Sequence, residues 1–276
     1  MLLCEADIAR AEGALAPPIA SESMTSLDLF SLQDRVAIVT GATRGIGRAI
    51  AFGMAEAGAS VSIVSRNADA CRATARELTA AGYRAIACPG HLGSVDDIAE
   101  ITATTVDRFG GIDVVVNNAA TALSEPVGEI TESALSKTTA VNLAGPVFLL
   151  QAATPHLKKS RHASVVNVVS AGAWMFLPEV AIYAATKAAL VSFTRSSAAA
   201  LAPHGIRVNA LAPGVVDTDK RATSSDALYH HLVNSATLRR AASPREMVGP
   251  VIFLASSASS YMTGSVLHVD GGTVAS

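Results

Sequence analysis

Short apolar runs alternate with longer segments of helical periodicity along most of the chain. Seven apolar runs occur, at 36–39, 61–64, 84–87, 114–116, 165–169, 207–211 and 266–269. Segments with the helical period lie between them, at 45–57, 68–81, 95–109, 132–155, 182–201 and 244–255. Continuously apolar strands that are separated by helices are typical of a parallel sheet covered on both faces. We therefore predict an α/β fold built on one doubly wound, seven-stranded parallel sheet.

The pattern predicts a single domain over residues 32–276, because neither an internal repeat nor a break in composition divides it. Residues 1–31 are rich in Ala, Pro and Ser, and we expect a flexible tail there, with a small helix packed on a neighbour as the alternative. They lack the pattern of a signal or transit peptide, and Met24 is a second candidate start.

Between 215 and 240 the strand pattern and the helix pattern are both weak. This indicates a lid or substrate loop, or else an ordinary surface loop.

Composition excludes several classes of protein. Of the 276 residues, 50% are hydrophobic and 16% are charged, so the chain is too apolar for a disordered protein. The net charge is −2 and no basic cluster exceeds a pair, which argues against a nucleic-acid partner. The three cysteines are widely spaced and form no Cys-x-x-Cys motif, so we expect neither a disulfide framework nor a zinc site, and a cytoplasmic location.

The longest stretch without a charged residue, 138–157, is long enough to raise the question of a membrane span. It contains Asn142, Gly145, Pro146 and Gln151, and the apolar residues between them suffice for a helix but not for a bilayer. We interpret the stretch as a buried core helix and expect no membrane partner.

A glycine-rich turn follows the first predicted strand and opens the first predicted helix. Its sequence is Thr40-Gly41-Ala42-Thr43-Arg44-Gly45-Ile46-Gly47. Such a turn lets the backbone approach a pyrophosphate, and the helix N-terminus supplies unpaired amides and partial positive charge. A glycine turn made only for packing is the alternative, because three glycines alone are weak evidence.

Together with the motifs that follow it, this turn resembles that of the short-chain dehydrogenase/reductase family over about residues 32–272. The other motifs are Asn117-Asn118-Ala119-Ala120, Asn142, Ser170, Tyr183-Ala184-Ala185-Thr186-Lys187 and Pro213-Gly214 followed by Thr218. The resemblance implies a Rossmann-type fold, a nicotinamide dinucleotide cofactor and a homotetramer or homodimer. Within the family the carbonyl reductase branch looks most similar, because Asn-Ala-Ala and His-x-Gly also occur there. Helix surfaces at 190–201 and 244–255 are candidates for burial between subunits.

The resemblance also implies which residues contact the cofactor. They are Gly41, Thr43, Arg44, Gly45, Ile46, Gly47, Ser65, Arg66, Asn67, His91, Leu92, Asn118, Ala119, Ala120, Tyr183, Lys187, Pro213, Gly214, Val216 and Thr218. Val216 and Thr218 would position the nicotinamide carboxamide. Two positions depart from the family pattern: His91 stands where an Asp often holds the adenine amino group, and Ala120 stands where a Gly is common.

The end of the second strand bears on the choice between NADP(H) and NAD(H). An enzyme that binds NAD places a carboxylate there to hold the ribose 2′-hydroxyl. Ser65 and Arg66 occupy this place, and Arg66 could join Arg44 in binding a 2′-phosphate through charge-assisted hydrogen bonds. We favour NADP(H), while NAD(H) stays open because Asn67 could bind a diol and Arg66 could be an ordinary solvated arginine.

Tyr183 and Lys187 are the candidate acid–base pair. Reduction of a carbonyl by hydride produces an alkoxide, which must receive a proton as it forms. A tyrosine of ordinary pKa, about 10, needs nearby positive charge to stabilise its phenolate near neutrality. The two residues are four positions apart on a predicted helix and so share one face, although such pairs also arise by accident on many helices.

Ser170 and Asn142 complete the candidate catalytic set. Ser170 follows the fifth predicted strand, so its hydroxyl would reach the cleft at the carboxyl edge of the sheet and hydrogen-bond the substrate carbonyl. Asn142 lies in the apolar helix, where a buried amide needs partners. The resemblance assigns it to a water-mediated proton relay from Lys187, whereas a structural asparagine of the core is the alternative.

The candidate substrate contacts lie just after Ser170, in loop 172–180, and in the weakly patterned segment 215–240. Trp174 and Phe176, with the apolar residues beside them, form either a substrate wall or a subunit contact. Tyr229, His230 and His231 are further candidates for contact with substrate. As metal ligands the adjacent histidines are poor candidates, and we expect no metal.

The motifs predict an NADP(H)-dependent oxidoreductase that transfers a hydride between the nicotinamide and a small carbonyl or secondary alcohol, with Tyr183 as the general acid/base. An NAD-dependent alcohol dehydrogenase or a 3-oxoacyl-thioester reductase of the same family is the first alternative. A non-catalytic dinucleotide sensor is the second, although the four catalytic positions are all present. A hydrolase is disfavoured because the chain has neither a Gly-x-Ser-x-Gly motif nor a P-loop.

Overall fold

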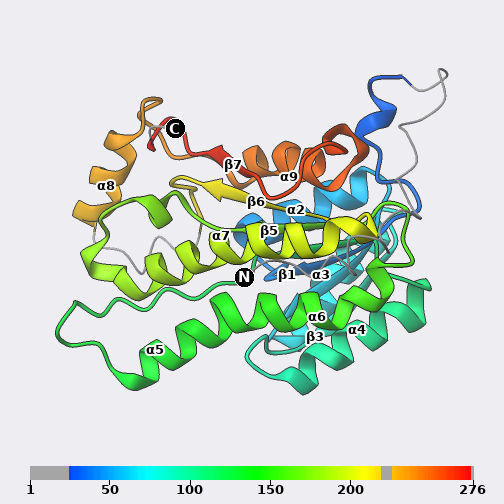
Figure 1. Cartoon of the computed structure of the whole chain (residues 1–276), viewed down its shortest axis with the longest axis horizontal. Helices are drawn as coiled ribbons and strands as arrows, with labels where there is room; N and C mark the ends of the chain where they lie inside the picture. The colour runs from blue at the N-terminus through cyan, green and yellow to red at the C-terminus, as the bar shows by residue number, and fades with distance from the viewer. Residues whose placement is uncertain (1–24, 219–225, 275–276) are drawn as a thin grey trace, which may run out of the picture.

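The computed structural model describes residues 25–218 and 226–274, which fold around one parallel sheet (Figure 1). The strands are β1 (Val36–Thr40), β2 (Ser60–Ser65), β3 (Ala85–Pro89), β4 (Val114–Asn117), β5 (Ser164–Val168), β6 (Arg207–Pro213) and β7 (Val266–Val269). Their order in the sheet is β3-β2-β1-β4-β5-β6-β7, and every pair is parallel. The predicted doubly wound fold with seven strands is confirmed.

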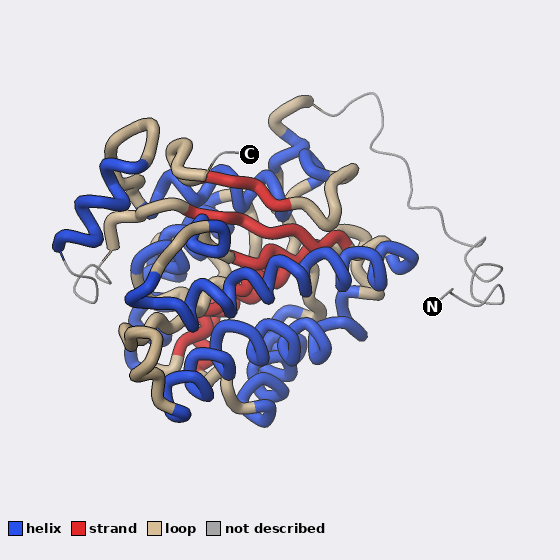
Figure 2. The backbone as a smooth tube through the Cα atoms, turned by 60° about the vertical axis from the view of Figure 1, so that its left-hand side comes forward, coloured by secondary structure: helices blue, strands red, loops and turns tan. Residues whose placement is uncertain are grey.

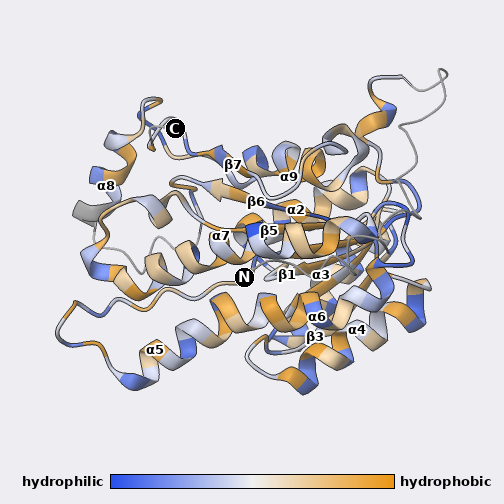
Figure 3. Ribbon diagram, in the orientation of Figure 1, coloured by the Kyte–Doolittle hydropathy of each residue, from blue (hydrophilic) through white to orange (hydrophobic). Residues whose placement is uncertain are grey.

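The sheet is enclosed by helices on both faces (Figure 2). The α-helices are α2 (Gly45–Glu56), α3 (Ala68–Ala80), α4 (Val95–Phe109), α5 (Glu132–Thr139), α6 (Gly145–Leu157), α7 (Ala181–Leu201), α8 (Asp226–Ser235) and α9 (Val248–Ala255). On one face Met54 of α2 and Leu254 of α9 pack against strand residues such as Val39. On the other face Ile101 of α4 and Leu149 of α6 pack in a second buried cluster. In Figure 3 much of the sheet is orange, the colour of hydrophobic residues, as expected for a sheet buried on both sides.

The switch point of the sheet lies between β1 and β4, because the chain winds outward from β1 to β3 and then crosses back to β4. In such a sheet a crevice opens at the carboxyl ends of the central strands. Side chains that follow β1, β4 and β5 are therefore brought together at one edge. The glycine turn, the Asn117-Asn118 motif and Ser170 follow these three strands.

The predicted continuous helix at 132–155 is wrong in one respect, because a π-helical turn at Ala140–Ala144 separates α5 from α6. Asn142 lies in this wider turn, and its side-chain amide hydrogen-bonds the backbone of Thr121. Pro146 stands in the first turn of α6, where a missing backbone N–H is tolerated. The hydrophobic periodicity continues through the break, so it could not reveal the extra residue in the turn.

The segment 215–240, for which no regular structure was expected, contains α8. Residues 219–225 lie outside the described residues. At the other end of the chain, most of the predicted tail, 1–24, also lies outside them. Residues Asp28–Phe30 form a single 3-10 turn, and the ring of Phe30 lies 6.4 Å from that of Phe253 in α9. None of the described helices is long and apolar enough to cross a membrane.

Candidate active site

The glycine turn wraps tightly around the N-terminus of α2. Gly41 and Gly45 have φ angles of +66° and +53°, which glycine adopts without a steric penalty. A Cβ atom on Gly47 would lie 2.3 Å from the Gly41 carbonyl oxygen and 2.3 Å from Nδ2 of Asn118. Asn118 Nδ2 donates a hydrogen bond of 2.8 Å to the Thr40 carbonyl oxygen, which fixes the turn to the end of β4. The turn therefore leaves the backbone open toward the cavity described next.

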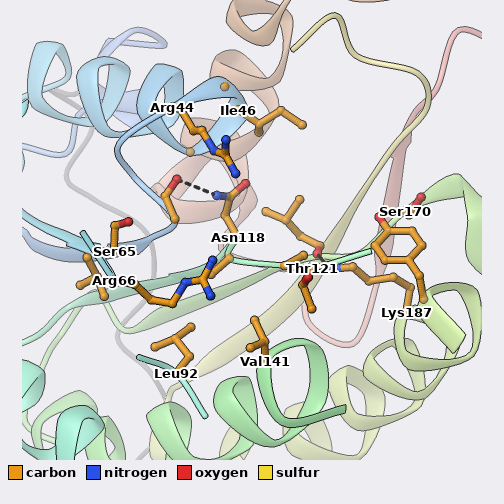
Figure 4. A pocket seen from close by; sticks show the side chains of 18 of the residues that line it. Arg44, Ile46, Ser65, Arg66, Leu92, Asn118, Thr121, Val141, Ser170 and Lys187 are labelled. Carbon is orange, nitrogen blue, oxygen red and sulfur yellow. Dashed lines mark hydrogen bonds between the residues drawn. The ribbon is translucent and has the colours of Figure 1, made fainter. Parts of the chain in front are cut away.

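A cavity of about 720 Å³ extends along the carboxyl edge of the sheet from Arg44 and Arg66 to Ser170 and Lys187 (Figure 4). The predicted cofactor contacts that line it are Gly41, Thr43, Arg44, Gly45, Ile46, Gly47, Ser65, Arg66, His91, Leu92, Asn118, Ala119, Ala120, Tyr183, Lys187, Pro213, Gly214, Val216 and Thr218. Lys137 also lines it, and no Asp or Glu does among the described residues. The size, the helix N-terminus and the excess of cations fit a large phosphate-bearing ligand.

Asn67 is the one predicted cofactor contact that the structure does not place in this cavity. It is the N-cap of α3, and its Oδ1 accepts a hydrogen bond from the Ala70 N–H at 3.0 Å. Asn is a favoured N-cap residue because its side chain satisfies an otherwise unpaired helix amide. The prediction that Asn67 binds a ribose diol therefore gains no support from the structure.

His91 and Leu92 lie in the turn after β3, and the turn is held by local hydrogen bonds. The His91 N–H donates to Oδ2 of Asp97 at 2.7 Å, and Nδ1 of His91 accepts from the Gly93 N–H at 2.9 Å. The hydrogen bond from His91 and another from Ser94 lower the pKa of Asp97. These bonds fix the His91 ring at the cavity wall, at the position where an Asp is common in the family.

The end of β2 carries no carboxylate that faces the cavity. The Ser65 hydroxyl accepts a hydrogen bond of 3.2 Å from Thr43 in the glycine turn. Arg44 and Arg66 are both exposed, and Figure 4 shows their side chains entering the cavity from the glycine turn and from the end of β2. This end of the cavity therefore presents two guanidinium groups.

The opposite end of the cavity holds Ser170, Tyr183 and Lys187. Lys187 is only 2% exposed, and its Nζ donates a hydrogen bond of 2.8 Å to the Val168 carbonyl oxygen. The same Nζ lies 5.7 Å from the centroid of the Tyr183 ring. The Ser170 Oγ accepts a hydrogen bond of 3.0 Å from the Gly172 N–H. The end of β5 and the first turns of α7 thus bring together the three side chains that the motifs predicted.

The Tyr183 side chain is half-buried, and desolvation of its phenol raises the pKa above the ordinary value of a tyrosine. A hydrogen bond with the Ser170 hydroxyl opposes the rise. The direction differs from the sequence expectation of a phenolate favoured by nearby charge, because loss of water outweighs the other effects. Tyr183 is therefore protonated at neutral pH and can act there as a proton donor.

Asn142 is fully buried and connects three parts of the site. Its Oδ1 accepts a hydrogen bond from the Thr121 N–H at 2.8 Å, and its Nδ2 donates to the Thr121 carbonyl oxygen at 2.9 Å. Nδ2 also donates to Oγ1 of Thr186, the residue that precedes Lys187, at 3.1 Å. The side chain thus joins the loop after β4, the π-helical turn and α7.

A second cavity of about 220 Å³ adjoins the first. Six of the lining residues are common to the two cavities. They are Ser170, Tyr183, Pro213, Gly214, Val216 and Thr218. The hydroxyls of Ser170 and Tyr183 therefore stand where a molecule in the large cavity would meet one in the small cavity. This is the arrangement that a reaction between two bound molecules requires.

Trp174 and Phe176 do not line the small cavity, so of the two alternatives, a substrate wall and a subunit contact, the first gains no support from the structure. The Trp174 ring packs 4.7 Å from the ring of His268, and Phe176 is fully exposed. Their neighbours Met175 and Leu177 line the cavity instead. Successive side chains of an extended segment point to opposite sides. The sequence alone did not show which of these side chains point toward the cavity.

From the segment around α8, Tyr229 and Leu232 line the small cavity, whereas His230 and His231 do not. Sequence reasoning missed Glu179 at the small cavity and Lys137 and Val141 at the large one. Lys137 and Val141 are four residues apart and so share a face of the predicted helix, but the sequence did not show that this face meets the cavity. Glu179 lay within the predicted loop 172–180 but was not singled out.

Comparison with known proteins identifies the family. The family model described as "Enoyl-(Acyl carrier protein) reductase" matches residues 41–274. A 3-oxoacyl-[acyl-carrier-protein] reductase of Staphylococcus epidermidis is 34% identical over 240 residues, covering 87% of this chain and 98% of the relative. The chain belongs to the short-chain dehydrogenase/reductase family. It is thus an oxidoreductase that acts on CH–OH groups with a nicotinamide dinucleotide.

Other members of the short-chain dehydrogenase/reductase family have different names and substrates. An L-rhamnose 1-dehydrogenase (NAD(P)(+)) of Azotobacter vinelandii is 38% identical over 248 residues, covering 87% of this chain and 97% of the relative. The crystal structure of a gluconate 5-dehydrogenase from Burkholderia cenocepacia, in complex with NADP and tartrate, is 33% identical with a TM-score of 0.86. It covers 90% of this chain and 98% of its own. Membership of the family therefore does not specify the substrate.

Proposed function

We propose that the chain is an NADP(H)-dependent oxidoreductase that interconverts a small ketone and the corresponding secondary alcohol. The observation that supports this most directly is the junction of the two cavities at Ser170 and Tyr183. The carbonyl reductase branch is our proposal for its place in the family, supported by the Asn118-Ala119-Ala120 and His91-Leu92-Gly93 sequences. Measurement of NADPH consumption with a panel of ketones tests the proposal, and the absence of consumption with every ketone would contradict it.

In the proposed reaction each catalytic side chain has one task. The nicotinamide, when bound, supplies the hydride for reduction or accepts it in oxidation. Tyr183 donates its phenolic proton to the carbonyl oxygen in reduction and takes the proton back in oxidation. Ser170 donates a hydrogen bond to the same oxygen and holds the carbonyl in place. Both roles agree with the position of the two hydroxyls at the junction of the cavities.

Lys187 and Asn142 would support the proton transfer. The Lys187 ammonium lies near the Tyr183 ring and favours the phenolate that remains after proton donation. Asn142 hydrogen-bonds Thr186 beside Lys187, and we assign it to the proton relay between Lys187 and solvent. The helix N-terminus, Arg44 and Arg66 would hold the phosphates of the dinucleotide.

The proposed loops 172–180 and 215–240 would bind the substrate. Met175 and Leu177 from the first loop and Tyr229 and Leu232 from the second line the small cavity. The reacting carbon would lie between these side chains and the two catalytic hydroxyls.

The proposed preference for NADP(H) depends on the guanidinium groups of Arg44 in the glycine turn and Arg66 at the end of β2. The Arg66→Ala variant is expected to weaken NADPH binding by about tenfold or more and NADH binding little, because only NADPH carries the 2′-phosphate. Isothermal titration of both cofactors measures the difference. Arg76→Ala, which removes an exposed arginine from α3 away from the cavity, is the matched control. Equal losses for NADPH and NADH would refute the assignment of Arg66.

The raised pKa of Tyr183 predicts opposite pH dependences for the two directions. Oxidation of an alcohol requires the deprotonated phenol, so kcat/KM should rise by up to about tenfold per pH unit on the alkaline side of neutrality. Reduction requires the protonated phenol, so kcat/KM should stay level through neutral pH and fall in the same alkaline range. Rate profiles in both directions measure this, and an oxidation rate that does not change with pH would contradict it.

A further inference from the structure

The two cavities differ in the sign of the charge that lines them. Among the described residues, the large cavity carries Arg44, Arg66, Lys137 and Lys187 and no carboxylate. The small cavity carries one carboxylate, Glu179, and no lysine or arginine. The substrate side of the site is therefore negative while the cofactor side is positive.

Glu179 lies in the 3-10 turn Pro178–Val180, directly before α7 and four residues before Tyr183. Its backbone carbonyl oxygen accepts a hydrogen bond of 3.2 Å from the Ser124 hydroxyl, which holds the turn to the loop after β4. The residue is half-buried, and its carboxylate has no hydrogen bond or ion pair with any of the described residues. A substrate that fills the cavity would remove water from this carboxylate, and the loss is costly unless the substrate supplies a donor.

Among the described residues, Glu179 is the one charged side chain of the small cavity. Its other polar side chains bear hydroxyl groups and are those of Ser170, Tyr183, Thr218, Tyr229 and Thr273. Leu177, Val180 and Leu232 are among its walls. At about 220 Å³ the cavity is smaller than the 300–1,000 Å³ typical of sites for drug-sized ligands. It suits a small substrate with one apolar side and one group that meets Glu179.

We propose that Glu179 determines substrate specificity by selecting a small alcohol or ketone that carries a second hydrogen-bond donor, a hydroxyl or an ammonium group, and by rejecting one that carries a carboxylate. The donor group would hydrogen-bond the carboxylate, whereas a substrate carboxylate would meet a like charge in a partly desolvated site. This inference rests on the proposed function for the reacting end of the substrate. It adds the chemistry of the other end of the substrate, the end that meets Glu179.

A matched series of four secondary alcohols tests the proposal. The compounds 4-amino-2-butanol, 1,3-butanediol, 2-pentanol and 3-hydroxybutyrate share a CH₃–CH(OH)–CH₂ unit and differ in the terminal group. Their binding is measured by calorimetry on the NADP⁺ complex of the Tyr183→Phe protein, so the result does not depend on turnover. With Glu179 present, the amino alcohol and the diol should bind more tightly than 2-pentanol, and 3-hydroxybutyrate most weakly, with about fivefold between the ammonium compound and 2-pentanol.

The Glu179→Gln change in the same background removes the charge but keeps the size of the side chain. It should reduce the preference for the ammonium compound by about fivefold and relieve the rejection of 3-hydroxybutyrate. Glu129→Gln, which neutralises an exposed glutamate outside both cavities, should leave the order unchanged. An order of binding that the Glu179→Gln change leaves unaltered would overturn the proposal, as would tightest binding of 3-hydroxybutyrate or no binding of the two donor-bearing compounds.

Failure of the proposed function would show differently. A Tyr183→Phe enzyme that oxidises these alcohols at the parent rate would refute the acid–base role of Tyr183, while the order of binding would still decide the role of Glu179.

Discussion

Replacement of Tyr183 by Phe is expected to lower kcat/KM for carbonyl reduction by about 10³-fold, which is typical of the loss of a general acid. The change removes one hydroxyl from a half-buried ring and leaves the ring to fill the same space. Arg44 and Arg66 lie at the opposite end of the cavity from Ser170 and Lys187 (Figure 4), so the Kd for NADPH should stay within about twofold of the parent value. Steady-state kinetics and calorimetry on the same preparation measure the two quantities.

The control for this change is Tyr261→Phe, because the Tyr261 side chain is fully exposed and lines neither cavity. It should retain the parent kcat/KM. A Tyr183→Phe enzyme as active as the parent would contradict the acid–base assignment. Loss of NADPH binding together with activity would indicate that Tyr183 holds the cofactor instead of transferring the proton.

The second large effect is expected from Gly47→Ala. The new methyl group would lie 2.3 Å from the Gly41 carbonyl oxygen and from Nδ2 of Asn118, so backbone must move to admit it. Such overpacking costs about 1–3 kcal/mol and displaces the turn that we assign to the pyrophosphate. The Kd for NADPH should therefore increase by about tenfold or more, and Tm should fall.

The matched control is Gly249→Ala in α9, where a Cβ meets no atom within 4 Å. Alanine is the better helix former, so this change should leave NADPH binding unchanged and stabilise the protein by up to about 1 kcal/mol. Calorimetry and thermal unfolding distinguish the two glycines. Unaltered NADPH affinity in Gly47→Ala would mean that the glycine turn serves packing only, the alternative left open by the sequence.

The sheet was predictable because its central strands β1, β2, β4, β5 and β6 are buried over almost their whole length and are therefore mostly apolar. The position of the large cavity followed from the same pattern, since the carboxyl ends of parallel strands share one edge. Residues that act through the backbone, such as Gly41 and Gly47, were found because their spacing is set by the turn itself. The fold and the proposed cofactor side of the site could thus be predicted from local sequence patterns, the apolar runs and the glycine spacing.

The substrate side was less predictable because it depends on how individual side chains are directed. Met175 and Leu177 face inward and Phe176 faces outward, although all three are apolar. Asn67 serves as a helix cap, a use that the sequence allowed equally well. The side chain of Asn142, in the π-helical turn, hydrogen-bonds the backbone of Thr121, which lies 21 residues away in sequence. No local pattern reports such a contact.

The central claim is that hydride passes from the nicotinamide to a carbonyl held by Ser170 and Tyr183. The most direct test supplies NADPH with deuterium at both C4 positions together with 4-hydroxy-2-butanone, 4-amino-2-butanone, 2-pentanone or acetoacetate. Mass spectrometry of the products should show one deuterium on the carbinol carbon of the alcohol formed, and Tyr183→Phe should form it at a rate lower by about 10³-fold. An enzyme that binds NADPH but forms no labelled alcohol from any of the four ketones would contradict the account.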